Sequence, residues 1–113
     1  MKINHVTLII RDKKKSEEFY TKLLGFDKKE IDDHLWIKIG DQYIHLSDNS
    51  GRAVHNSFYH FAIQLDDLPN YIDKLKEKGI NAFDVSENKM QCFIRDPDGN
   101  LIEFIDSKNE YFK

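Results

Sequence analysis

Residues 3–25 read INHVTLIIRDKKKSEEFYTKLLG, and this stretch predicts a strand followed by a helix that ends at a glycine. Its first nine residues are apolar and β-branched with partial alternation, as in a strand. Asp12 is placed to cap a helix whose apolar residues recur at helical spacing, and Gly25 is placed to end it. The same order recurs in residues 59–79, YHFAIQLDDLPNYIDKLKEKG, where Gly79 ends the helix. The repeat predicts two modules built on one plan.

Each predicted helix is followed by three short strand signals. These signals fall at 26–31, 34–40 and 42–47 in the first module and at 82–85, 90–95 and 100–106 in the second. Polar residues, about 49–57, link the modules. We therefore predict a single α+β domain over residues 1–113, in which two βαβββ modules (about 1–48 and 58–113) form a curved mixed sheet. The more polar face of that sheet is expected to line a cup, with the helices on its outer face.

Composition excludes several classes of partner. The chain has 113 residues, of which 33% are charged, with a formal net charge of −3 and no basic stripe, so we expect no nucleic-acid binding. It has no long apolar segment and no signal-peptide core, so we expect no membrane partner. The single cysteine, Cys92, suits a reducing compartment, and the expected location is cytoplasmic. A small molecule is the expected partner.

Four polar side chains occupy equivalent places when the two modules are superposed. His5 and His60 lie on the first strand of each module, and His45 and Glu103 lie on the last. Strand alternation puts all four on the polar face, so we expect them to converge on the cup. Three imidazoles and a carboxylate can bind a divalent transition metal, and two histidines with Glu103 alone leave coordination positions open for substrate or water.

Hairpin pairing suggests residues that line the same cup. A two-residue loop at Gly40-Asp41 would place Trp36 opposite His45, and a four-residue loop at 96–99 would place Cys92 opposite Glu103. Further candidates for binding the substrate are Tyr43, Met90 and Arg95. For each of these residues, plain packing or solvation is the alternative. Two other histidines, His34 and His55, are expected to be solvated and uninvolved.

At these residues the chain resembles the vicinal oxygen chelate superfamily, which includes glyoxalases, bleomycin-resistance proteins and dioxygenases. The segments that carry the resemblance are INHVTL at 3–8, FYTKLLGF at 19–26, YHFA at 59–62 and DPDGNLIEF at 96–104. The resemblance implies paired βαβββ modules and a divalent metal in the cup, with ligands at His5, His45, His60 and Glu103. Nickel, zinc, manganese and iron all accept this mixture of ligands, and the sequence does not select among them. It also implies a homodimer in which modules of different chains often complete each site.

The resemblance favours a metal-dependent lyase or isomerase of the glyoxalase type. Relatives resembling glyoxalase I carry a carboxylate or amide where this chain has His45, so Glu103 is the one carboxylate of the set. Either His45 or Glu103 could move the proton that such chemistry requires.

Three alternatives remain open within the same superfamily. A dioxygenase would keep two histidines and Glu103 as an iron triad, although the extra module usual in extradiol enzymes is missing. A thiol transferase of the fosfomycin-resistance kind would keep the same triad, but no clear set of phosphonate-binding basic residues is present. A metal-free binding protein that sequesters an aromatic or antibiotic ligand is permitted by Trp36 and Tyr43.

Overall fold

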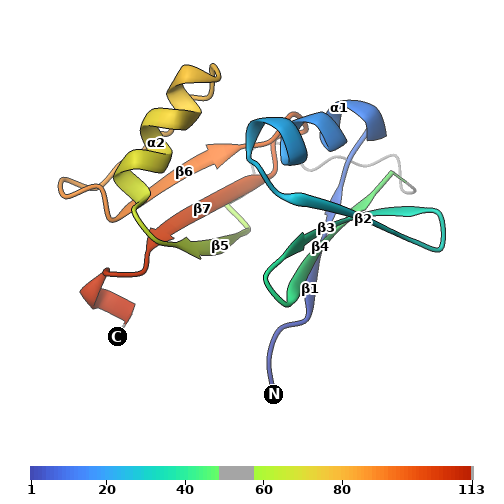
Figure 1. The fold of residues 1–113 in the computed structure, drawn as a ribbon, viewed down its shortest axis with the longest axis horizontal. Helices are drawn as coiled ribbons and strands as arrows, with labels where there is room; N and C mark the ends of the chain where they lie inside the picture. The colour runs from blue at the N-terminus through green and yellow to red at the C-terminus, as the bar shows by residue number, and fades with distance from the viewer. Residues whose placement is uncertain (49–57, 113) are drawn as a thin grey trace. The chain divides into compact units, whose positions relative to one another are not determined.

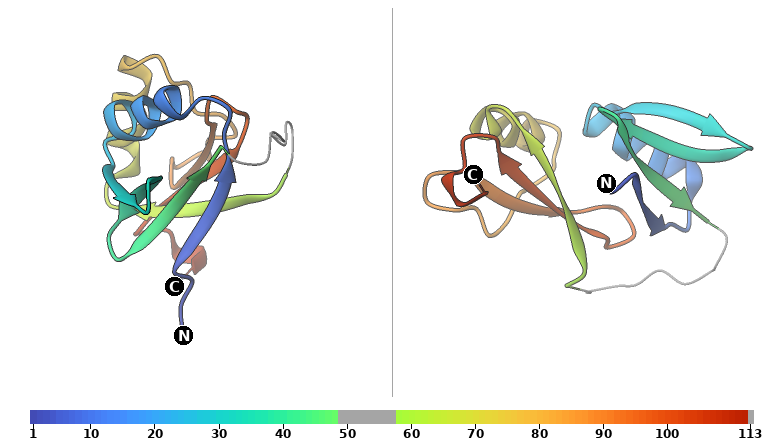
Figure 2. Two further views of the ribbon diagram at one scale, coloured as in Figure 1. Left: turned by 90° about the vertical axis from the view of Figure 1, so that its right-hand side faces the viewer. Right: turned by 90° about the horizontal axis from the view of Figure 1, so that it is seen from below.

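The computed structural model describes residues 1–48 and 58–112, which form two compact units. Within the described chain, unit 1 comprises residues 1–48 and 96–100, and unit 2 comprises residues 58–95 and 101–112. Each unit has its own mixed sheet with helical structure along one face (Figures 1 and 2).

Unit 1 contains a four-stranded sheet with the order β1-β4-β3-β2. The strands are β1 (His5–Ile9), β2 (Asp27–Ile31), β3 (His34–Ile39) and β4 (Gln42–Ser47). Strands β1 and β4 are parallel, and the other two pairs are antiparallel. Side chains alternate as the sequence predicts: Leu35, Ile37, Ile44 and Leu46 are buried on one face, and the opposite face carries the polar and aromatic residues.

The helical segment of unit 1 begins where the sequence predicts. The Asp12 side chain accepts a hydrogen bond from the backbone N–H of Lys15 and caps α1 (Lys13–Glu18). The segment then widens into a π-helical turn, η1 (Phe19–Leu23), and ends at Gly25, whose φ of +84° suits glycine.

Unit 2 contains a three-stranded sheet with the order β5-β7-β6. Its strands are β5 (His60–Leu65), β6 (Gln91–Arg95) and β7 (Leu101–Asp106), with β5 parallel and β6 antiparallel to β7. The helix α2 (Leu68–Glu77) packs on this sheet, with the ring of Tyr71 edge-on to that of Phe104. Its first N–H, that of Leu68, donates to the buried Asp106 carboxylate at 2.8 Å.

The turn at residues 96–100 is held by buried and partly buried hydrogen bonds within unit 1. The Tyr20 hydroxyl donates to Asp96 Oδ2 at 2.7 Å, and the Arg11 backbone N–H donates to Asp98 Oδ1 at 3.1 Å. The Asn100 side chain donates to a carbonyl of β1 at 3.1 Å. Burial, together with the Asp96 carboxylate, raises the pKa of Tyr20 well above its ordinary value, which keeps its hydroxyl a donor. The aspartates of DPDGN are therefore structural anchors.

The fold class predicted from the sequence, α+β with two βαβββ-type modules of mixed sheet, is confirmed. The strand predicted at 82–85 is reduced to one isolated bridge between Phe83 and Phe93. His34 opens β3, and His55 falls outside the described residues. The single-domain organisation stays a prediction. Within residues 1–48 and 58–112, no helix has the length and apolar character needed to cross a membrane.

Candidate functional site

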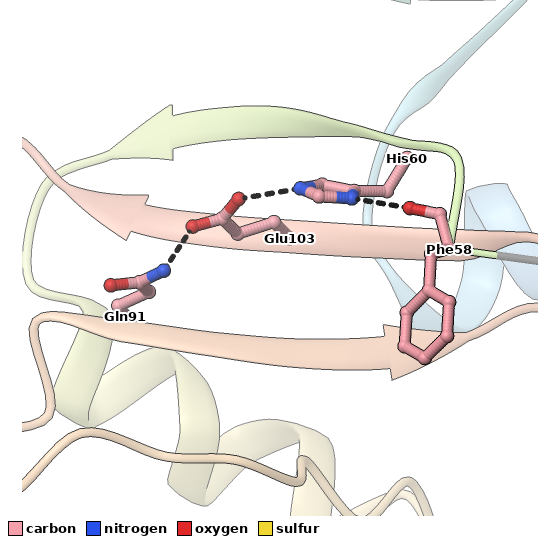
Figure 3. Close-up of polar contacts among 4 residues, drawn as sticks. All are labelled: Phe58, His60, Gln91 and Glu103. Atoms are coloured by element: carbon pink, nitrogen blue, oxygen red, sulfur yellow. Dashed lines mark hydrogen bonds and ion pairs between the residues drawn. The ribbon is translucent and has the colours of Figure 1, made fainter.

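In unit 2, a chain of polar contacts runs across all three strands of the sheet (Figure 3). His60 Nε2, on β5, lies 3.0 Å from Glu103 Oε1, on β7. The side-chain amide of Gln91, on β6, donates to the other oxygen of the same carboxylate. Glu103 is buried, with 6% of its surface exposed, whereas His60 is partly exposed. The Glu103 carboxylate thus has a separate partner on each oxygen.

The contact made by the other ring nitrogen of His60, Nδ1, indicates where the ring carries a proton. His60 Nδ1 lies 2.9 Å from the backbone carbonyl of Phe58, so it carries the proton that this acceptor requires. Nε2 then either holds a second proton for Glu103 or presents a lone pair beside it. A backbone carbonyl on the far nitrogen is the usual support for a metal-binding histidine.

The donor types of His60 and Glu103 also suit a shared cation. An imidazole nitrogen and a carboxylate oxygen are both ligands that divalent transition metals accept. The two donor atoms, Nε2 and Oε1, lie 3.0 Å apart.

In unit 1, an aromatic row covers the polar face of the sheet. Trp36 stacks on His45 with ring centroids 4.3 Å apart, and the ring of His5 meets Trp36 edge-on at 4.9 Å. Tyr43 also meets Trp36 edge-on, at 6.0 Å. His5 Nδ1 lies 3.0 Å from the side-chain oxygen of Asn4. His5 therefore resembles His60 in having an oxygen acceptor on Nδ1, which leaves Nε2 as its ligand atom.

Among the residues that the structure describes, His45 Nε2 is a buried polar atom with no hydrogen-bond partner. Burial lowers the pKa of His45, and the nearby imidazoles of His34 and His5 lower it further. The ring is therefore neutral at neutral pH. An unpartnered buried imidazole nitrogen is costly unless a ligand satisfies it, so this atom also fits a metal or substrate.

The four predicted metal ligands form two pairs, one in each unit. His5 and His45 share the aromatic row of unit 1, and His60 and Glu103 are hydrogen-bonded in unit 2. Within residues 1–48 and 58–112, no three His, Cys, Asp or Glu side chains are grouped closely enough to hold a metal ion. Convergence of all four on one point therefore stays a prediction.

Comparison with known proteins gives the family. Residues 2–104 match the Glyoxalase/Bleomycin resistance protein/Dioxygenase superfamily. The chain belongs to this superfamily. A Vibrio parahaemolyticus protein named a probable lactoylglutathione lyase is 32% identical over 95% of this chain and 91% of its own length.

Solved structures of the superfamily's fold match the chain over nearly its whole length. A Bacillus anthracis protein assigned to the glyoxalase family has a TM-score of 0.83 and 22% identity, covering 96% of each chain. TnmS3, an antibiotic binding protein from Streptomyces sp. CB03234, has a TM-score of 0.78 and 20% identity, covering 94% of this chain and 95% of its own. At these identities the likeness concerns the fold alone.

One predicted pairing in this superfamily member is wrong. Cys92 pairs with Phe104 and is fully buried on the helix side, whereas Phe93 pairs with Glu103. The cause is the turn: Asp96 Oδ1 accepts hydrogen bonds from the backbone N–H groups of Asp98 and Asn100, which makes the loop five residues long instead of four. One extra residue moves every β6 side chain to the opposite face.

The remaining predicted substrate-binding residues fall in different places. Trp36 pairs with His45 as predicted, and Tyr43 lies on the same face. Arg95 ends β6 and, by strand alternation, shares the face of Glu103. Met90 precedes β6, and its carbonyl accepts from the Asp106 N–H at 2.9 Å. Their roles toward a substrate stay predictions.

Sequence reasoning missed three neighbours of the candidate ligands. Gln91 and Phe93 share the face of Glu103, and a five-residue loop assumed at 96–100 would have found both. His34, set aside as solvated, lies edge-on to the ring of His45 at 5.5 Å. Its alternation with Trp36 along β3 was the available signal.

Proposed function

We propose that this chain is a metal-dependent enzyme of the glyoxalase type, a lyase or isomerase acting on a small substrate that presents two neighbouring oxygens. One divalent transition metal would be held by His5, His45, His60 and Glu103. The observation that carries the proposal is the contact between His60 Nε2 and Glu103 Oε1, which brings two preferred metal ligands together while the Phe58 carbonyl lies at the other ring nitrogen of His60.

The proposed substrate class is the adduct of a 2-oxoaldehyde with a thiol. The support is the Vibrio parahaemolyticus relative, whose name refers to a thioester of lactate with glutathione. Such a thioester is an isomer of the hemithioacetal formed by a 2-oxoaldehyde and the thiol. The conversion moves one proton from the carbon that bears sulfur to the adjacent carbon, and the hydroxyl and carbonyl exchange places.

A divalent metal would supply Lewis-acid polarisation of the two substrate oxygens and stabilise the negative charge that develops on them. Two residues of this chain are suited to carry the proton. The Glu103 carboxylate is oriented by its two partners, and the neutral His45 imidazole can accept a proton at Nε2 whenever that atom does not hold the metal. Burial of Glu103 restricts the water that would compete for the proton.

The proposal is tested by assaying protein purified without a histidine tag. Methylglyoxal with glutathione is supplied, and thioester formation is followed after chelation and after adding nickel, zinc, manganese or ferrous iron. We expect activity to disappear on chelation and to return with at least one metal. Glu103→Gln should lose at least 100-fold in kcat/KM, corresponding to about 2.7 kcal/mol, while Glu87→Gln, in an exposed loop, should match wild type. Lack of thioester with every metal would refute this substrate class.

A metal-free binding protein is the second candidate, and the aromatic row of unit 1 favours it. Trp36, Tyr43 and His45 together offer flat ring surfaces and edges to a planar ligand. The two candidates differ in how a metal affects stability, because a ligand bound only by the native state raises the melting temperature. A melting temperature that falls on chelation supports the enzyme. An unchanged value in a metal-containing preparation supports the binding protein.

A further inference from the structure

We propose that Gln91 is a positioning residue for Glu103, holding the carboxylate so that one chosen oxygen faces the metal and His60. The inference rests on the proposed function, since it concerns the same metal site. Its basis is the side-chain hydrogen bond from Gln91 Nε2 to Glu103 Oε2 (Figure 3).

The strand register explains why these two side chains meet. Gln91 pairs with Ile105 across the antiparallel β6 and β7, and Glu103 pairs with Phe93. Gln91 and Glu103 are thus diagonal neighbours on one face, a separation that long side chains can span. The five-residue turn at 96–100 sets this register, because a one-residue shift would turn Gln91 to the other face.

The chemistry of an amide suits this task. The Gln91 NH₂ group is a neutral donor, so it can hold Oε2 without neutralising the carboxylate or competing for a cation as a charged group would. With Oε2 held, Oε1 is the oxygen directed at His60 Nε2, at 3.0 Å. The Phe58 carbonyl holds the His60 ring in a similar way, by accepting a hydrogen bond from Nδ1. Each ligand of unit 2 therefore has a fixed partner on the atom that does not face the other ligand.

The chain supplies a matched control in Gln64. Gln64 lies on β5 and pairs with Ile105 from the side opposite Gln91, so both glutamines flank the same residue on the same face. Gln64 is exposed, and no role in metal binding is proposed for it. Gln91→Met and Gln64→Met remove the same amide and preserve nearly the same length and volume.

The test measures affinity for zinc by competition with a chromophoric chelator, using the full chain purified without a histidine tag. We expect Gln91→Met to raise the zinc dissociation constant by roughly 10- to 100-fold, and Gln64→Met by less than about 3-fold. Cobalt absorption gives a second readout that a purely structural role would not change. The visible bands should shift in Gln91→Met and stay as in wild type in Gln64→Met. Gln91→Ala provides the same comparison if the methionine variant folds poorly.

Two outcomes separate the failure of this inference from the failure of the proposed function. If wild type binds no zinc or cobalt, the metal site itself is wrong and the inference falls with it. If wild type binds metal and His60→Ala loses it, but Gln91→Met and Gln91→Ala bind as tightly as Gln64→Met with unchanged cobalt bands, the metal site stands. Gln91 would then have no positioning role.

Discussion

Trp36 lies flat on His45, with ring centroids 4.3 Å apart and an angle of 7° between the ring planes. The stack follows from the two-residue loop between β3 and β4, which makes these residues direct cross-strand partners. Trp36 is the one tryptophan of the chain. Its fluorescence therefore reports on the charge of the imidazole beneath it.

Trp36 fluorescence should fall on acidification as His45 gains its proton, because an imidazolium quenches indole emission on contact. Burial and the neighbouring imidazoles lower the pKa of His45, so we expect a midpoint below pH 6.5. A fluorescence titration of the metal-free protein measures it. The titration uses a His5→Gln background, because the His5 ring also meets Trp36 edge-on at 4.9 Å. In this background, His34→Gln should move the midpoint upward, and His45→Gln should remove the transition. A midpoint above pH 6.5 in the His5→Gln protein would show that His45 is not the desolvated ring described here.

Tyr20→Phe should destabilise the protein by about 1–3 kcal/mol, since the buried Asp96 carboxylate loses the donor that lies 2.7 Å from it. For a domain of this size, each kcal/mol corresponds to roughly 4–8 °C in Tm. Thermal unfolding provides the measurement. Tyr111→Phe, at a position that is 86% exposed, is the control and should change stability by less than about 0.5 kcal/mol. Equal melting temperatures for the two variants would rule out an anchoring role for the turn at 96–100.

Cys92 should be unreactive toward iodoacetamide in the native protein at neutral pH. Burial raises the pKa of its thiol to about 11, and Glu103 contributes in the same direction. Because the reactive species is the thiolate, alkylation should occur only after unfolding in denaturant, and mass spectrometry can count the adducts. Rapid modification of the native chain would show that the Cys92 thiol is accessible, in contradiction to its burial.

The two hairpins show how far sequence alone predicts the faces of the strands. The pairing of Trp36 with His45 follows from a short loop at Gly40-Asp41, where loop length leaves little choice of register. The predicted pairing of Cys92 with Glu103 is wrong because the Asp96 side chain accepts hydrogen bonds from backbone N–H groups within the turn. The turn is therefore one residue longer than predicted. A side-chain hydrogen bond inside a turn is not visible in hydrophobic periodicity.

For the candidate site too, the sequence predicts some features and leaves others to the structure. Repeat matching predicts that His5 and His60 share equivalent strand positions, and β1 and β5 each begin at one of them. It does not predict what supports His60 and Glu103, because the Phe58 carbonyl and the Gln91 amide make contacts set by backbone position and register. The strand positions of the candidate ligands are thus predictable from sequence, whereas the orientation of their side chains requires the fold.

The most direct test of the account is metal content per chain, measured by elemental analysis on tag-free protein after loading with nickel, zinc, manganese or ferrous iron and removal of excess ion. We expect one ion per wild-type chain and loss of that ion in both His5→Ala and Glu103→Gln. Glu87→Gln should retain it. An ion that persists in either ligand variant, or a wild-type chain that holds none of the four metals, would contradict the proposed ligand set.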